Sequence, residues 1–210
     1  MKKAKTWSTM TLAMIPICIA INFVGAQIAN ALKLPMYLDV IGTIMMGAIC
    51  GPVPGMVLGA LSTLINSIAA PASIAYLPVT VAFGLVSGLL AKKGFMKTVP
   101  KVILTGFIIA FIGVALSTPI TALLYGGITG TGQSAMIMAM QAMGMSLITA
   151  TLISGLITEF ADKLISVAIV FIVGKALSDR MLSKFPLGYL YFKHPVVEEA
   201  EETPVETPAK

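Results

Sequence analysis

The run from Val102 to Thr158 contains no Asp, Glu, Lys, Arg or His, and it constrains the fold more than any other feature of the chain. About 20 apolar residues suffice for one helix to cross a membrane, and this run is far longer. Only 11% of the 210 residues are charged and the mean hydropathy is +0.95, whereas a soluble domain carries roughly 25% charged residues. The sequence therefore predicts an all-α integral membrane protein.

A regular glycine pattern indicates where the helices of the N-terminal half pack. The glycines recur at four-residue intervals, as Gly47, Gly51, Gly55 and Gly59, with Pro52 and Pro54 between them. Positions four apart share a helix face, and a face of small residues lets two backbones approach closely inside a membrane. Because proline breaks a helix, we expect two short helices flanking residues 51–55. The polar pair Tyr37 and Asp39 precedes them, and Asp39 alternatively only caps a helix.

Basic residues predict the topology. They form three clusters: Lys2, Lys3 and Lys5; then Lys92, Lys93, Lys97 and Lys101; then Lys175, Arg180, Lys184 and Lys193. If all three clusters are cytoplasmic, an even number of spans separates each from the next. This predicts six transmembrane helices, at about 8–32, 38–50, 55–69, 77–91, 102–125 and 158–178, in the cell membrane with both termini cytoplasmic.

The remaining apolar segment, 134–157, is the odd one, because a crossing there would place the last basic cluster outside. We expect an extra re-entrant or surface helix on the outer side, packed against protein. Residues 1–180 are predicted to form a single membrane domain. Residues 181–210 are predicted to form a cytoplasmic tail, disordered from about 196, where five glutamates accompany prolines and threonines.

The sequence contains few residues suited to catalysis. The single histidine, His194, lies beside the acidic tail, so no Ser–His or Cys–His pair is expected within the membrane. The chain has no GxxxxGK[ST] phosphate loop, and Cys18 and Cys50 lack metal-ligand spacing. We therefore expect no enzyme activity, no metal and no bound cofactor in this chain, and no nucleic-acid partner.

Binding finds more. In the predicted topology, polar and aromatic residues gather on the outer side, where they would line a pocket within an apolar wall. The candidate substrate-binding residues are Asn30, Tyr37, Asp39, Asn66, Tyr76, Tyr125, Thr129, Gln133, Met136, Met140 and Gln141. Each tyrosine alternatively belongs to an interfacial aromatic belt. Glu159, Asp162 and Lys163 need a partner or water, and the last two alternatively mark the outer start of the last helix. The methionine-rich run suits a mobile lid or plain core filler.

These features resemble a known family. Leu34-Pro-Met-Tyr-Leu-Asp-Val-Ile-Gly-Thr43, then Gly51-Pro-Val-Pro-Gly55, and Asp162-Lys163-Leu-Ile-Ser resemble the substrate-binding S-component of energy-coupling factor (ECF-type) ABC transporters, over roughly residues 8–180. The resemblance implies a high-affinity vitamin-binding subunit with six helices. It also implies partners: a transmembrane coupling subunit and two ATPase subunits, which would hydrolyse ATP. In the family, the loaded subunit topples in the membrane and releases its ligand inward.

The resemblance is nearest to the cobalamin-specific members, so cobalamin uptake is the expected function. A riboflavin-like vitamin or a queuosine precursor remains open, as do a stand-alone carrier and a membrane scaffold. Many family members carry an Ala-x-x-x-Ala pattern on the first helix that meets the coupling subunit, and this chain has Gly25-x-x-x-Ala29 instead. The expected partner-docking residues are Gly25, Ala29, Gly47, Gly51, Gly55 and Gly59.

Overall fold

The computed structural model describes residues 7–191, and these residues form helices and short links without any strand. The long helices are α1 (Thr9–Ala31), α3 (Pro52–Ala69), α4 (Leu77–Lys92), α5 (Val99–Pro119) and α7 (Leu147–Ala176). The short ones are α2 (Ile41–Cys50), α6 (Gly132–Ala142) and α8 (Asp179–Leu182). Three further turns, η1 (Pro71–Tyr76), η2 (Ile120–Leu124) and η3 (Gly188–Tyr191), complete the fold. The all-α fold class is confirmed.

The bundle is apolar on its outer surface, and its interior combines a hydrophobic core with buried polar groups. Four helical stretches are long and apolar enough to cross a membrane: 9–31, 52–69, 71–92 and 99–124. Ile17, Phe111 and Ile172 expose more than half of their surface, whereas Asn22 and Thr43 expose none. The Asn22 amide donates to the Thr43 and Ser62 hydroxyls, at 2.9 Å each. Exposed apolar side chains and hydrogen bonds between helices are typical of a bundle packed in lipid.

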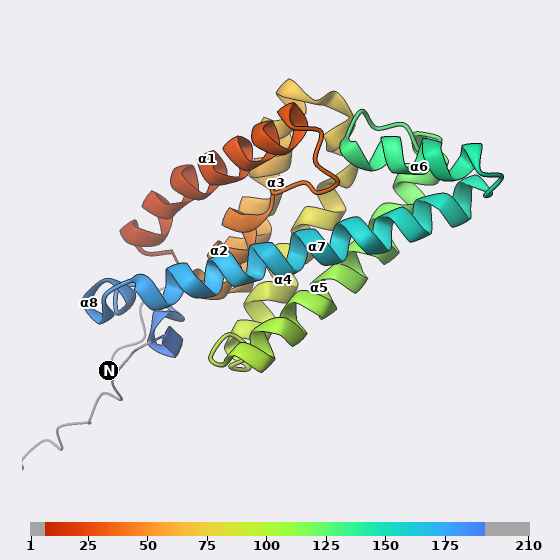
Figure 1. Cartoon of the computed structure of the whole chain (residues 1–210). Coiled ribbons are helices and arrows are strands. Elements are labelled where there is room, and N and C mark those ends of the chain that lie inside the picture. The colour runs from red at the N-terminus through yellow and green to blue at the C-terminus, as the bar shows by residue number, and fades with distance from the viewer. Residues whose placement is uncertain (1–6, 192–210) are drawn as a thin grey trace, which may run out of the picture.

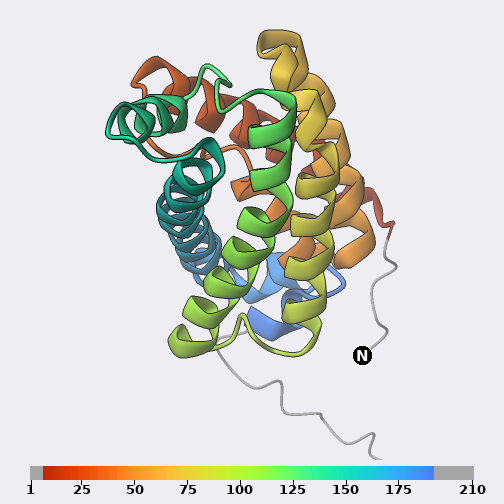
Figure 2. The ribbon, with the colours of Figure 1, turned by 90° about the vertical axis from the view of Figure 1, so that its right-hand side faces the viewer.

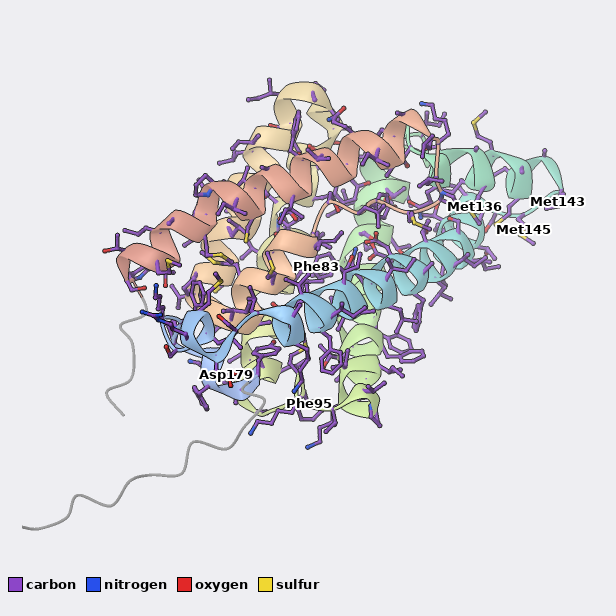
Figure 3. All side chains as sticks on the ribbon, turned by 60° about the vertical axis from the view of Figure 1, so that its left-hand side comes forward. Phe83, Phe95, Met136, Met143, Met145 and Asp179 are labelled. Atoms are coloured by element: carbon purple, nitrogen blue, oxygen red, sulfur yellow. The ribbon has the colours of Figure 1, made fainter. Side chains whose placement is uncertain are left out.

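The helices run between two ends of the bundle. α1 begins at the end where α8 lies, and α6 lies at the other end (Figure 1). Helices α3, α4 and α5 stand side by side, with α7 on the other side of α5 (Figure 2). Phe95, in the α4–α5 link, lies at the same end as Asp179 of α8 and opposite Met143 and Met145 (Figure 3). The second and third basic clusters therefore share one end, as the even-span rule requires; Lys2, Lys3, Lys5 and Lys193 lie outside the described residues.

The break between α2 and α3 is a single residue. Gly51 has φ = +106°, ends α2 and begins α3, and Pro52 takes the first helical position. Proline is tolerated there because that residue's N–H has no partner within the helix. The sequence predicts the break correctly but places the second helix at 55. Pro52–Gly55 instead forms the first turn of α3.

The glycine strips bring α2, α3 and α4 into close contact. A Cβ on Gly47 would lie 2.7 Å from the Gly84 carbonyl oxygen, and one on Gly55 would lie 2.5 Å from the same atom. Gly59 approaches the Thr80 carbonyl oxygen in the same way, at 2.4 Å. A Cβ on Gly51 would meet no atom closer than 4.0 Å, so this glycine serves the turn rather than a close helix contact. The predicted close approach of backbones is present, and it joins helices of this chain.

The segment before the last long helix differs from the expectation. The predicted re-entrant or surface helix, 134–157, is divided: α6 ends at Ala142, and α7 begins at Leu147 rather than near 158. Gly144, with φ = +90°, makes the turn, and the Ser146 hydroxyl accepts the Thr149 N–H as the cap of α7. As a result α7 has 30 residues, and Glu159, Asp162 and Lys163 lie in its middle. The alternative that Asp162 and Lys163 mark the start of the last helix is therefore wrong.

The ordered fold extends past the predicted boundary at residue 180. After α8, η3 packs beneath the bundle, and the Leu187 N–H donates to the Ile49 carbonyl oxygen at 2.9 Å. Leu182, Phe185 and Tyr191 are buried there. Residues 181–191 are thus part of the packed structure, and the predicted disordered stretch from about 196 lies outside the described residues.

Tyr191→Phe is expected to stabilise the protein. The Tyr191 side chain is fully buried against Gly174, and its hydroxyl has no hydrogen-bond partner within residues 7–191. An unsatisfied buried hydroxyl costs about 1–3 kcal/mol, and phenylalanine removes it without changing the shape. The thermal unfolding midpoint in detergent should rise, whereas Tyr189→Phe, at an exposed position of the same turn, should leave it unchanged. A lower midpoint for Tyr191→Phe would show that the hydroxyl is satisfied.

Candidate ligand-binding site

The bundle encloses a cavity of about 390 Å³ at the end opposite the described basic clusters. Its position follows from the shortness of α2, which has 10 residues where α3 has 18. At 1.5 Å per residue, α2 spans only about 15 Å, so the link 32–40 occupies the space in the bundle beyond the N-terminal end of α2. The cavity lies between this link, the C-terminal ends of α1 and α3, the start of α4 and the middle of α7.

Three ionisable residues on α7 form a buried ion cluster: Glu159, Asp162 and Lys163. The Lys163 ammonium lies 2.5 Å from Asp162 Oδ2 and 3.1 Å from Glu159 Oε2, and none of the three exposes more than 2% of its surface. The ammonium also lies 4.6 Å from the centre of the Phe83 ring. Charges buried this deeply persist only when paired and hydrogen-bonded, so this cluster is a coupled unit. Glu159 and Lys163 line the cavity.

Asp162 ties the link 32–40 to α7. Its Oδ1 accepts the backbone N–H of Leu38 at 2.7 Å and that of Tyr37 at 3.2 Å. Leu38 has φ = +52°, a conformation that a branched side chain adopts rarely. Its carbonyl oxygen lies where a Cβ on Gly25 would stand, 2.0 Å away. The bonds to Asp162 therefore hold a strained loop in place, and Gly25 leaves room for it.

The same loop is held from its other side by α6. The Tyr37 hydroxyl donates to Gln133 Oε1, and Gln133 Nε2 donates to the Ser154 hydroxyl at 3.3 Å. Gln133 is buried and does not line the cavity. It connects α6, α7 and the loop, so its role here is to position Tyr37.

Asp39 presents a carboxylate to the cavity from the link before α2. It takes part in no ion pair among the described residues, where Lys163 pairs only with Glu159 and Asp162. The nearby carboxylates of Asp162 and Glu159 repel the Asp39 carboxylate, whereas the Lys163 charge attracts it. With these groups ionised, the charge of Asp39 is only partly balanced.

Tyr76 and Tyr125 stabilise the wall of the cavity through ring stacking and hydrogen bonds. Tyr76 and Tyr125 stack with ring centres 6.1 Å apart. Tyr76 forms a hydrogen bond with the Thr121 hydroxyl at 2.7 Å, and Tyr125 donates to the Ala72 carbonyl oxygen at 2.8 Å. These bonds attach η1 to η2 and to the residue that follows it. Of these two tyrosines, only Tyr76 lines the cavity.

Of the predicted binding residues, the cavity brings together six: Asn30, Tyr37, Asp39, Asn66, Tyr76 and Thr129. Five do not line it: Tyr125, Gln133, Met136, Met140 and Gln141. The last four are on α6, which packs on α7 at the end opposite Asp179 and Phe95 (Figure 3). Thr63, Thr80 and Phe83 line the cavity and were not predicted. Glu159 and Lys163, which the sequence marked as charges that need a partner or water, line it as well.

The predicted docking residues lie mostly inside the bundle. Gly47, Gly51, Gly55 and Gly59 are buried, and Ala29 is 3% exposed. Gly25 is half-buried against Leu38. The glycine strips at 47–59, which were predicted to contact a partner subunit, thus pack against other helices of this chain. The most exposed methionines, by contrast, are Met138 and Met143 near the end of α6, which suits a surface that meets lipid or another molecule.

The fold and the cavity together define a class: a helical bundle with an apolar exterior and a pocket near one end. The pocket wall combines apolar, hydroxyl and amide groups, a composition typical of small-molecule binding sites. No protein-family model, curated protein sequence or solved structure matches the chain.

Proposed function

We propose that this chain is the membrane-embedded substrate-binding subunit of an ECF-type importer and captures a vitamin or related micronutrient from outside the cell. The observation that supports it most is the cavity near the end opposite the described basic residues, with hydroxyl, amide and carboxylate groups set in an apolar wall. Basic ends of membrane proteins face the cytoplasm, which would direct the cavity outward. The sequence resemblance supplies the family, and the cavity supplies a binding site suited to it.

The proposed topology has six spans, formed by α1 to α5 and α7, with α6 on the outer side. Successive helices alternate between the two ends of the bundle, which returns α8 to the end where α1 begins (Figure 1). α2 is too short to span alone, and the link 32–40 would complete its crossing. Irregular backbone is tolerated at membrane depth when protein surrounds it, and here Asp162 satisfies two of its N–H groups.

ATP hydrolysis is assigned in this proposal to two partner ATPases, joined to this chain through a coupling subunit. Ligand release would follow toppling of the loaded subunit toward the cytoplasm. During this change, the two hydrogen bonds from the link 32–40 to Asp162 control whether the link moves with α7. This assembly rests on the family resemblance.

The cavity volume bears on which ligand is proposed. Pockets for drug-sized ligands measure about 300–1,000 Å³, and this one, at about 390 Å³, lies near the lower limit. A corrinoid is larger than a drug-sized ligand and would need the outer helix ends to part. The volume therefore favours the smaller micronutrients over the cobalamin towards which the sequence resemblance points.

Isothermal titration calorimetry on the detergent-purified chain tests the proposal, with a panel of vitamins that includes cyanocobalamin. We expect one compound to bind in a one-to-one ratio. Uptake of that compound by cells should then require the coupling subunit and both ATPases. A folded protein that binds no compound in the panel would contradict the proposal.

A stand-alone carrier is a second candidate, and the buried ion cluster favours it. Ionisable groups inside a membrane commonly mark ion or proton pathways. Three carboxylates, Asp39, Glu159 and Asp162, lie near one lysine in the bundle. Uptake by proteoliposomes that contain this chain alone, driven by a proton gradient, would favour this candidate over the importer subunit.

A further inference from the structure

The walls of the cavity carry unbalanced negative charge. Asp39 and Glu159 line it, and Asp162 lies directly behind, whereas Lys163 is the single cationic group among the lining residues. The Lys163 ammonium is engaged by Asp162 and Glu159 at 2.5 and 3.1 Å. With all four groups ionised, three carboxylates face one ammonium. An uncompensated charge in a low-dielectric interior is strongly disfavoured, so the cavity favours a proton or a cation.

The cavity is also lined by a polar side chain, Asn66, whose amide lacks a hydrogen-bond partner among the described residues. Asn66 is buried, with 7% of its surface exposed. Buried amides are nearly always hydrogen-bonded in folded proteins. Asp39, on the link 32–40, likewise has no side-chain partner in an ion pair. A carboxylate outside any ion pair and an amide without a hydrogen bond among the described residues thus line the same cavity.

We infer that the ligand of this cavity is a compact organic cation, with Asp39 as its counter-charge and Asn66 as a hydrogen-bonding group. This rests on the proposed function and specifies its substrate class. The volume of about 390 Å³ limits the ligand to a small molecule. Val40, Val79 and Phe83 give the cavity apolar wall area that suits the uncharged part of such a molecule.

A charge-sorted set of vitamins tests the inference by calorimetry on the detergent-purified chain. Thiamine and pyridoxamine supply cations, riboflavin and cyanocobalamin neutral molecules, and biotin and pantothenate anions. We expect one of the two cations to bind in a one-to-one ratio, at least tenfold more tightly than any neutral or anionic probe. One-to-one binding of a neutral or anionic vitamin instead would overturn the inference and leave the proposed function standing. Binding of none would overturn both.

Asp39→Asn provides the residue-level test. The amide has nearly the same shape as the carboxylate but no charge, so affinity for the cationic probe should fall at least tenfold. The control is Asp179→Asn, which removes a carboxylate at the far end of the bundle (Figure 3) and should leave affinity unchanged. Unchanged affinity in Asp39→Asn, with the thermal unfolding midpoint retained, would overturn the role of Asp39.

Discussion

Lys163→Met is expected to lower the free energy of unfolding by about 3–5 kcal/mol, the usual result of removing one partner from a buried ion pair. The ammonium is 1% exposed and contacts two carboxylates, Glu159 and Asp162, that are equally inaccessible to water. Methionine fills much of the same volume but leaves both carboxylates without a counter-charge. The measurement is the thermal unfolding midpoint of the purified protein in detergent.

Two comparisons separate the charge effect from simple loss of packing. Adding Glu159→Gln and Asp162→Asn to Lys163→Met neutralises the whole cluster, and most of the lost stability should return. Lys175→Met removes a lysine near the end of the same helix, where the ammonium lies 5.9 Å from the Phe171 ring, and should have little effect. If the neutral triple variant is no more stable than Lys163→Met, the destabilisation does not arise from unpaired charge.

The cluster also determines the shape of the cavity, which connects this result to function. Asp162 holds the link 32–40 through the Tyr37 and Leu38 N–H groups, and that link carries Asp39 into the cavity. Without Lys163, the Asp162 carboxylate would lose the ammonium that holds its Oδ2 at 2.5 Å, so its Oδ1 would hold the two N–H groups less firmly. Loss of Lys163 should therefore weaken ligand binding even though the lysine itself is already paired.

The sequence predicted the features of the fold that depend on local chemistry. The prolines after Gly51 indicated a break, and the basic clusters indicated which links share an end of the bundle. The start of α7 was missed because charge parity treats 134–157 as one segment. Gly144 and the Ser146 cap divide that segment, and both are short-range signals that a count of spans ignores.

The site was predicted in part. A sequence indicates near which end of the bundle a residue lies more readily than it indicates where its side chain points. Asn66 and Tyr76 lie on α3 and η1 and face the cavity. Tyr125 and Gln133 lie at a similar depth, but their side chains bond to Ala72 and Tyr37 instead. Side-chain direction depends on how each helix is rotated against its neighbours, and the spacing of polar residues in an apolar run does not determine that rotation.

Gly84→Ala is expected to be the other strongly destabilising substitution, because it adds a methyl group where two helix backbones touch. A Cβ on Gly84 would lie 2.2 Å from both the carbonyl carbon and the carbonyl oxygen of Gly55. No side-chain rotation relieves a clash with backbone, so α3 and α4 must separate. Overpacking typically costs about 1–3 kcal/mol, and a backbone clash lies at or above the upper end.

Gly155→Ala is the matched control for this substitution. Gly155 is also a buried glycine within a long helix, but a Cβ there would lie 3.5 Å from the nearest atom, the Thr118 hydroxyl oxygen, which is ordinary contact. Since alanine favours helix over glycine by about 1 kcal/mol, Gly155→Ala should leave the unfolding midpoint unchanged or raise it. Equal midpoints for Gly84→Ala and Gly155→Ala would show that α3 and α4 tolerate a wider separation. The glycine strips would then be dispensable for packing within this chain, and the same surfaces would again be open to contact with a partner subunit.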